Sequence, residues 1–502
     1  MAERVLVIGA GIAGLCVALA LAPTGREVVL LERDPEPPDG SADTAFAEWE
    51  RRGVGHLRHS HAFLARLRTI IRDGHPELLA DLRAAGCREL GLDGMLTELH
   101  RQTYAPRPED GDLVVLTSRR TTLELVIRRY VERLPGVEIR PETFVRRLLV
   151  ERPDLGPPVV AGVSVDTAEG PRHLLADLVV DAGGRTSSGI EQLVEEGVRV
   201  REEAEPSRIL YFTRHYRLLP GQAEPPRGSP PANGDLGFLK YGVFPGDNGH
   251  FSITLCLPEI EMELRKAVVR PETFDAICRQ LPGPSLWVDP ARAEGISRVF
   301  GMGDLQSRWR DLVHEGEPAV LGYFPVGDSL VRTNPLYGRG CSFAAVTAYG
   351  LRDALEAADS PAERLRLFHR KVHAELRPYY VSMRDQDRSS IRRARHTLTP
   401  GYRPDLRARL IKSFVEDGIN IAVRSDPEVL REALRGFHML EPPSAWLRRP
   451  NNLVRVLGFW ARGKRRNAAA YPPRLGPDRA PLMQALGLSP QADIDRLRAE
   501  TA

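Results

Sequence analysis

The sequence predicts an α/β protein: a Rossmann-like nucleotide-binding domain with an inserted, mostly antiparallel β-sheet domain and a helical C-terminal region. Three observations predict this class. A glycine-rich strand–helix–strand pattern opens the chain, a strand–loop–helix pattern occupies residues 318–350, and strands with a hairpin turn lie between them. We expect the nucleotide-binding domain in two parts, residues 1–195 and 297–400, the β-sheet domain at residues 196–296, and the helical region at residues 401–502.

Composition sets outer limits on function. A chain of 502 residues with 42% apolar residues is long enough for two or three packed units. Its net charge of +3 combines mixed charges of both signs, which argues against a dedicated nucleic-acid binder. The five cysteines are far apart and form no C-x-x-C pair, so we expect neither a disulfide framework nor a zinc site, and a cytoplasmic location fits.

The first element pair is a complete strand–helix–strand unit. Val5 to Ile8 read as a buried parallel strand, and a helical run follows the glycine motif and ends near Leu21. Glu27 to Leu31 read as the second strand, which closes on Glu32 and Arg33. The spacing is that of a dinucleotide-binding fingerprint rather than an isolated glycine-rich turn.

Each part of this fingerprint has a physical role. Gly9 permits a tight turn, Gly11 lets a pyrophosphate approach the backbone, and Gly14 lets the helix lie close to the sheet. The helix N-terminus offers free N–H groups to the phosphates, and a carboxylate at the tip of the second strand accepts hydrogen bonds from ribose hydroxyls. That carboxylate would repel a 2′-phosphate, but the motif does not separate FAD from NAD. The expected cofactor-binding residues here are Gly9, Gly11, Ala13, Gly14, Glu32 and Arg33.

The same segment permits another interpretation. Residues 5–22 carry no charge and follow Arg4, as in a signal peptide or a membrane span. The regularly spaced glycines and the strand that follows at once oppose this interpretation. We expect no stable membrane insertion.

A second motif begins with an apolar strand at residues 319–326. The strand ends in Gly327 and Asp328, a loop with Pro335 and Gly338 follows, and a helix begins near Gly340. This order of elements resembles the FAD-dependent aromatic hydroxylase and epoxidase superfamily, most closely its polyether and polyene epoxidase branch.

The resemblance implies FAD as the cofactor. It assigns the ribityl chain of FAD to Asp328 and the flavin pyrimidine edge to the helix N-terminus, where partial positive charge stabilises the negative charge of reduced flavin. The usual Ala-Ala-His after Gly-Asp is replaced by residues 329–331, Ser-Leu-Val, so the local loop contacts differ. The residues expected to bind FAD here are Gly327, Asp328, Pro335, Gly338, Gly340, Cys341 and Ser342.

Two more segments match the family. Arg120 lies in a helix start followed by Leu123 and Glu124, and the resemblance gives it a flavin contact; a solvated helix-start residue is the alternative. Residues 178–185 read as a buried strand ending in a turn, which the family associates with FAD and NAD(P)H, so Asp181 is a further cofactor-binding candidate. Plain turn glycines are the alternative there.

A histidine pair and a basic, apolar segment are weaker indications of function. His59 and His61 alternate in sequence, but two ligands without Cys or carboxylate partners are too few to predict a metal site; similarity to the epoxidase branch favours a loop near the isoalloxazine ring. Residues 446–466 combine apolar and basic residues, which fits a membrane surface or another subunit. We expect instead that this helix packs the side formed by Leu453, Val456, Leu457 and Trp460 on the core.

The middle of the chain has strand patterns and its end has helical patterns. Residues 209–216 and 239–244 read as strands, and Gly246-Asp247-Asn248-Gly249 is a hairpin turn leading to a strand at residues 251–257. The family has such a sheet as one wall of its substrate cavity. Residues 340–500 read as mainly helical, with breaks at prolines 378, 400, 427, 442 and 472.

These patterns support a functional hypothesis. The resemblance implies an FAD-dependent monooxygenase in which NAD(P)H, or a separate flavin reductase, reduces FAD. A flavin C4a-hydroperoxide then transfers one oxygen atom of O₂, by epoxidation or hydroxylation, to a bulky apolar natural-product intermediate. The sequence singles out no catalytic acid, base or nucleophile.

The sequence is also compatible with two other functions. One is an FAD-dependent reductase or dehydrogenase of an isoprenoid or polyketide, and another is a noncatalytic nucleotide-binding module. A halogenase is disfavoured, because the Trp-x-Trp-x-Ile-Pro motif of that family is absent.

Overall fold

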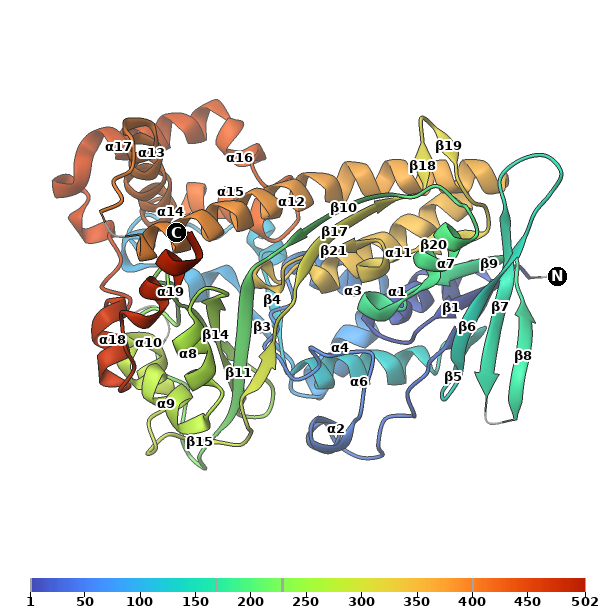
Figure 1. Ribbon diagram of the computed structural model, residues 1–502, viewed down its shortest axis with the longest axis horizontal. Coiled ribbons are helices and arrows are strands. Elements are labelled where there is room, and N and C mark those ends of the chain that lie inside the picture. The colour runs from blue at the N-terminus through green and yellow to red at the C-terminus, as the bar shows by residue number, and fades with distance from the viewer. Residues whose placement is uncertain (1, 168, 227–229, 400, 502) are drawn as a thin grey trace.

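The computed structural model describes residues 2–167, 169–226, 230–399 and 401–501. A parallel five-stranded sheet in the order β20-β9-β1-β2-β5 lies toward one end of the long axis (Figure 1). Val5 and Val7 of β1 pack into one apolar cluster and Leu6 into another, so both faces of the strand are covered, as its uninterrupted apolar run requires. The strands are β1 (Arg4–Ile8), β2 (Glu27–Leu31), β5 (Val137–Arg140), β9 (Leu178–Asp181) and β20 (Tyr323–Pro325).

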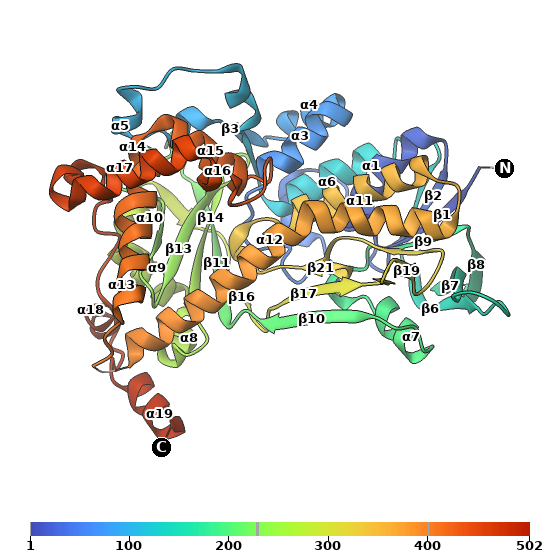
Figure 2. The ribbon, with the colours of Figure 1, turned by 90° about the horizontal axis from the view of Figure 1, so that it is seen from above.

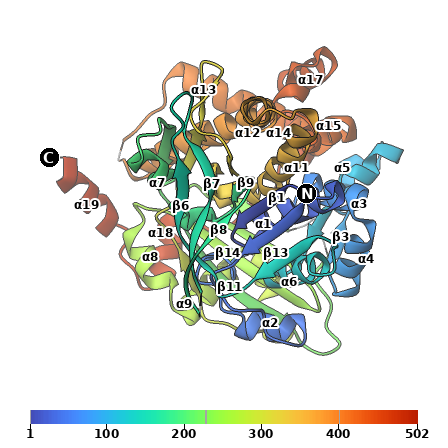
Figure 3. The ribbon, with the colours of Figure 1, turned by 90° about the vertical axis from the view of Figure 1, so that its right-hand side faces the viewer.

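Helices cover one face of this sheet and a second sheet covers the other. The helical face consists of α1 (Ile12–Leu21), α6 (Arg120–Val131) and α11 (Gly340–Ala357), with α3 (Ala65–Gly74) and α4 (Pro76–Ala84) beside them. The other face packs on an antiparallel sheet, which lies toward the viewer in Figure 3. Its strands are β6 (Phe144–Glu151), β7 (Val159–Thr167) and β8 (Gly170–Leu175).

An antiparallel sheet lies at the other end of the long axis (Figure 1). In β14, Phe251, Ile253 and Leu255 pack on covering helices, while Thr254 and Cys256 face the opposite side, as strand alternation demands. The strands are β11 (Ile209–Leu218), β12 (Asn233–Asp235), β13 (Lys240–Pro245), β14 (His250–Pro258), β15 (Ala293–Gly295) and β16 (Phe300–Met302), and the helices are α8 (Met262–Val268), α9 (Pro271–Gln280) and α10 (Pro282–Trp287).

The predicted hairpin turn is present between β13 and β14. Gly246 N donates to His250 O at 2.8 Å, and Asn248 and Gly249 have φ of 50° and 73°. The remaining strands form small sheets: β3 (Arg88–Leu90) pairs with β4 (Val115–Thr117), β10 (Arg201–Pro206) with β17 (Gln306–Asp311), β17 also with β21 (Val331–Arg332), and β18 (Val313–His314) with β19 (Glu317–Pro318). The remaining helices of this part are α2 (Ala42–Glu48), α5 (Glu98–Arg101) and α7 (Gly189–Glu195).

The C-terminal region is helical. Figure 2 shows α12 (Pro361–Leu398) running from the parallel-sheet end of the molecule to the C-terminal helices. These are α13 (Leu406–Ser413), α14 (Asn420–Ser425), α15 (Pro427–Phe437), α16 (Ala445–Arg448), α17 (Pro450–Arg466), α18 (Arg479–Ala485) and α19 (Ala492–Thr501). Leu482 and Met483 of α18 pack on the inserted sheet, so the end of the chain returns to its middle.

Three expectations about this region need correction or comment. The expected break at Pro378 is wrong, because α12 continues through it, whereas Pro427 begins α15 and Pro442 follows that helix. The break expected at residue 400 lies outside the described residues. No helix among the described residues is both long and apolar enough to cross a membrane.

Two other expectations were only partly right. The strand expected at residues 319–326 is reduced to β20, because Gly322 has φ of 71° and turns the chain just before it. In α17, Val456 is fully buried as expected, but Leu453 and Leu457 are 37% and 40% exposed. The helix packs through Asn452 and Val456, one turn apart, and through Trp460, whose ring contacts Phe414 as expected of that side.

Candidate functional site: a cavity between the two sheets

A single cavity of about 1100 Å³ lies between the end of the parallel sheet and the inserted sheet. This volume lies just above the usual range for small-molecule sites, and the carboxyl ends of parallel strands are where such sites form. Eleven of the fifteen residues predicted to bind the cofactor line it: Gly9, Gly11, Ala13, Glu32, Arg33, Arg120, Asp328, Pro335, Gly338, Gly340 and Cys341.

The N-terminus of α1 opens into this cavity. Gly11 is the N-cap, and no side chain caps the helix, so its first N–H groups are free. A Cβ atom at Gly11 would meet nothing nearer than Arg51 Nη2 at 3.8 Å, whereas one at Gly14 would collide with the carbonyl oxygen of Gly9. Gly14 therefore serves helix packing, and Gly11 leaves room for a ligand. Free N–H groups and the helix dipole suit the phosphates of a dinucleotide.

Glu32 lies on the cavity wall at the tip of β2, held by a buried network. Its Oε2 accepts from Ala10 N and from Arg51 Nη2, both at 2.9 Å. Arg51 also binds Glu124 at 2.6 Å and lies 3.4 Å from Asp34. Burial disfavours the charged guanidinium, but the three carboxylates outweigh it and raise the pKa of Arg51 above its ordinary value. The network fixes the carboxylate where a ribose can reach it.

The second motif lies directly beside α1. Gly327 has φ of 56° and a Cβ atom there would lie 2.9 Å from that of Ala13, so the two motifs pack directly together. Asp328 lies on the wall, and burial raises the pKa of its carboxyl although Arg332, Arg185 and Arg120 favour the charged form. The N-terminus of α11 begins beside it without a side-chain cap. The Asp328 carboxyl can bind the hydroxyl groups of a ligand chain, and the free N–H groups of α11 can bind a negatively charged ring edge.

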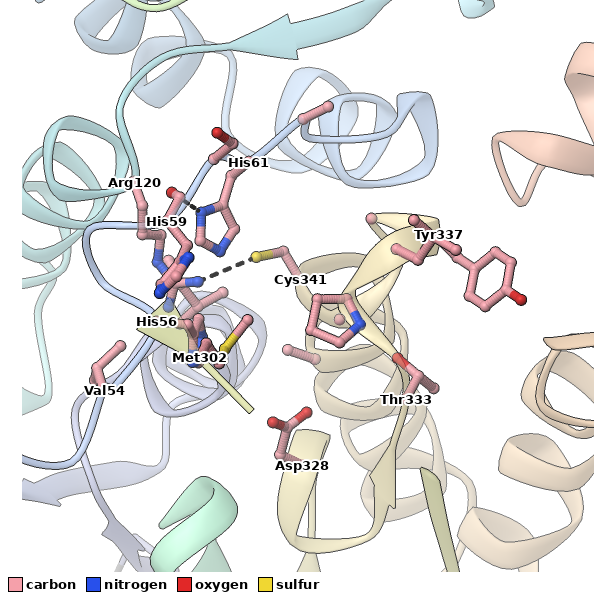
Figure 4. Close-up of a pocket in the computed structure, with 18 of the residues that line it drawn as sticks. Val54, His56, His59, His61, Arg120, Met302, Asp328, Thr333, Tyr337 and Cys341 are labelled. Carbon is pink, nitrogen blue, oxygen red and sulfur yellow. Dashed lines mark hydrogen bonds between the residues drawn. The ribbon is translucent and has the colours of Figure 1, made fainter. Parts of the chain in front are cut away.

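Arg120 connects α6 to the N-terminal end of α11. Its Nε donates to Glu124 at 2.9 Å, and its Nη1 contacts Cys341 Sγ at 3.5 Å (Figure 4). The side chain is buried, so the alternative of a solvated helix-start residue is wrong.

Four predicted residues do not line the cavity: Gly14, Asp181, Gly327 and Ser342. Asp181 is fully buried, and its carboxylate accepts from Gly183 N at 2.9 Å and from the Ser187 and Ser329 hydroxyls at 2.5 and 3.0 Å. It therefore holds the loop after β9, whose residues Gly183 and Gly184 do line the cavity.

Histidines gather on one wall opposite Asp328 and Cys341 (Figure 4). His59 Nδ1 lies 2.9 Å from Thr213 Oγ1, and His61 Nδ1 lies 2.8 Å from its neighbour's carbonyl, that of His59. Burial lowers the pKa of His59 to about 4 and, together with Arg120, that of His61 to about 3. Both rings are neutral at pH 7.

Sequence reasoning missed a buried acid behind the cavity. Asp387 of α12 accepts from Tyr337 Oη and Asn334 Nδ2, both at 2.9 Å, and Asn334 in turn accepts from Tyr211 Oη. Tyr211 and Tyr337 line the cavity. Burial raises the pKa of Asp387 to about 6 although both partners favour its charged form. No motif marks these residues, since they come from distant segments.

Comparison with solved structures agrees with this architecture. The p-nitrophenol 4-monooxygenase PnpA of Pseudomonas putida DLL-E4 is similar at 18% identity and a TM-score of 0.55, over 88% of this chain and 98% of that one. The flavin-dependent brominase Bmp2 is similar at 17% identity and a TM-score of 0.56, over 88% of this chain and all of that one. Both likenesses concern the fold.

Comparison by sequence shows the family. "Protein Rv3254" of Mycobacterium tuberculosis (strain ATCC 25618 / H37Rv) is 29% identical over 382 residues, 71% of this chain and 74% of that protein. The family model for FAD dependent oxidoreductases matches residues 4–280, more than half of the chain, including the α1 motif, Glu32, Arg120 and the first part of the inserted sheet. The chain belongs to the FAD dependent oxidoreductase family.

Proposed function

We propose that this oxidoreductase is a monooxygenase that inserts one oxygen atom of O₂ into a bulky, mostly apolar small molecule. One observation carries the proposal: a single cavity joins the dinucleotide-binding groups to a chamber under the inserted sheet. The cofactor and a large substrate then share one enclosed space, as oxygen transfer requires.

The chain's own residues divide the binding of FAD between them. The free N–H groups of α1 bind the phosphates, Glu32 binds the adenosine ribose, Asp328 binds the ribityl chain, and the N-terminus of α11 faces the pyrimidine edge. When bound, FAD supplies the electrons that activate O₂. The positive end of α11 stabilises negative charge at that edge.

The chamber favours an apolar substrate. Strands of the inserted sheet and the segment after it contribute mostly apolar side chains, which exclude water and bury an apolar ligand. These residues are Tyr211, Phe244, Cys256, Met302 and Leu305. Leu434 and Phe437 of α15 close the chamber on the side of the helical region.

Proton transfer is assigned to the buried acid and its partners. Asp387, Asn334 and the two tyrosines connect α12 to the cavity wall through hydrogen bonds. A carboxyl whose pKa lies at about 6 exchanges a proton near neutral pH, and Tyr337, whose hydroxyl donates directly to Asp387, passes the proton to the chamber. The neutral histidines of the opposite wall orient the ligand by hydrogen bonds rather than by charge.

The proposal extends to the reductant. NAD(P)H, either directly or through a separate flavin reductase, supplies the electrons, and the reaction is an epoxidation or a hydroxylation. The similarity in fold to the p-nitrophenol 4-monooxygenase PnpA supports oxygen insertion.

The test measures the origin of the product oxygen. Purified protein with FAD, NADPH or NADH and ¹⁸O₂ is incubated with a panel of polycyclic phenols and polyenes, and products are weighed by mass spectrometry. We expect O₂ consumption and one labelled oxygen atom per product molecule. Turnover under argon with an artificial electron acceptor, giving unlabelled product, would instead establish a dehydrogenase or reductase.

A further inference from the structure

A buried cation beside the cavity has no anionic partner. Arg339 precedes α11, between the cavity-lining Gly338 and Gly340, and is 4% exposed. Its Nε and Nη1 atoms form no hydrogen bond, and no carboxylate among the described residues pairs with it. Burial without a counter-charge lowers the pKa of this guanidinium to about 10.

Aromatic rings surround this guanidinium. Its central carbon lies 5.0 Å from the ring centroid of Tyr379, 5.7 Å from that of Tyr337 and 5.9 Å from that of Phe437. Rings at these distances hold a guanidinium in one orientation, and their cation–π attraction compensates part of the free energy lost when it is removed from water. They do not satisfy its N–H donors, which need acceptor atoms.

A second unsatisfied group lies nearby. His438 is 1% exposed and lines the cavity, yet neither of its ring nitrogens has a hydrogen-bond partner. Burial and the charge of Arg339 lower its pKa to about 4, so the ring is neutral at pH 7 and offers one N–H donor. The His438 backbone is fixed, since its carbonyl accepts from Arg66 N at 3.2 Å.

An uncompensated buried charge is costly, and buried polar atoms in folded proteins nearly always have partners. Two adjacent exceptions, His438 on the cavity wall and Arg339 packed on the lining residues Tyr337 and Phe437, therefore point to a ligand group. Arg339 extends toward α12 and α15 rather than toward α1, so that group comes from the chamber side and not from the phosphates of the cofactor.

We propose that Arg339 and His438 form a binding subsite for an anionic oxygen group, such as a carboxylate, carried by the otherwise apolar substrate. This rests on the proposed function only in taking the chamber as the substrate site. The guanidinium donates two N–H groups to the anion and the imidazole donates one. The substrate is thereby an amphiphilic acid whose apolar body lies under the inserted sheet.

The test compares two matched probes on the FAD-loaded, oxidised protein under argon. Naphthalene-2-carboxylate and 2-naphthylmethanol share one ring system and differ in charge, and binding is followed by the shift of the flavin absorption band and by calorimetry. We expect the carboxylate to bind at least about tenfold more tightly, since charge-assisted hydrogen bonds in a buried site are worth that much. Arg339→Met should bring the two affinities together, and Arg339→Lys should retain part of the preference.

Controls separate this subsite from general charge attraction. Arg424 also lines the cavity but donates to Ala470 O, and Arg424→Met should leave the preference unchanged. Without ligand, Arg339→Met should not lower the melting temperature, because it removes an uncompensated charge. Equal affinity of the wild-type protein for both probes, or binding of neither, would overturn the subsite. No step uses NAD(P)H or O₂, so absence of oxygen insertion would refute the proposed function and leave this inference standing.

Discussion

At the scale of single residues, the cavity depends on a glycine at the N-terminus of α1 and on a buried carboxyl in α12. Gly11 leaves open the space before the free N-terminus of α1, and Asp387 places a carboxyl in an environment that disfavours its ionised form. Each can be changed with little disturbance of the packing around it.

Gly11→Val tests the phosphate site. Gly11 has extended backbone angles, which valine adopts readily, and its Cβ would meet nothing within 3.8 Å, so the variant should fold. Its side chain would occupy the space of the pyrophosphate, and we expect the purified variant to lose most of its FAD, measured as the ratio of visible to ultraviolet absorbance. The control Gly111→Ala, at an exposed turn with free space, should keep its flavin. Full FAD occupancy in the valine variant would refute the assignment.

Asp387→Asn tests the buried acid through stability. A folded-state pKa raised to about 6 means that the folded state binds more protons than the unfolded state between pH 4 and 6, so wild-type stability falls as pH rises through that window. The variant lacks this loss and should gain about 2 kcal/mol on the wild-type protein between pH 4.5 and 7.5. Urea unfolding at the two pH values measures the difference. Parallel pH profiles would contradict the raised pKa.

At the scale of elements, the buried ion network holds the loop before α3 against β2 and α6. Arg51 is the common partner of Glu32, Asp34 and Glu124, all of them buried. Sequence alone does not identify Arg51, because its partners lie in two separate segments, the loop after β2 and α6.

Arg51→Met should therefore destabilise the fold by about 3–5 kcal/mol, since it leaves buried carboxylates unpaired, and it should weaken FAD binding through Glu32. Urea unfolding and FAD titration measure the two effects. Arg129→Met, which removes an exposed arginine from α6, should change neither by much. A neutral effect of the first substitution would show that Glu32 is held by other groups.

Helix α12 provides a test of its own. Pro378 lies in the helix interior and is exposed, so its ring costs a backbone hydrogen bond without contributing to the core. Pro378→Ala should raise the free energy of unfolding by about 1–3 kcal/mol. Pro361→Ala, at the first turn where proline is favoured, should not. The break expected at Pro378 failed because tertiary packing of Val372, Leu376 and Tyr380 carries the helix through it.

At the scale of the whole molecule, the parts predicted well are those coded by neighbouring residues. The α1 motif, the Gly327–Asp328 turn and the hairpin at residues 246–249 each depend on local glycine and strand patterns, and the structure has all three. The α/β class followed from them.

The parts not predicted depend on distant contacts. The cavity wall combines β1, the inserted sheet, β21 and α15, and the return of α18 to the inserted sheet has no sequence signal. Leu453 and Leu457 are exposed for the same reason. The apolar pattern of α17 does not show which face of the helix packs on the distant residues Val429 and Trp446.

The visible absorption spectrum of the purified protein shows whether the cavity holds a redox-active FAD, when it is recorded under argon before and after addition of NADPH or a chemical reductant and again after addition of O₂. We expect about one FAD per chain, bleaching on reduction, and return of the flavin bands with O₂. A colourless protein that takes up no FAD during titration would contradict this expectation.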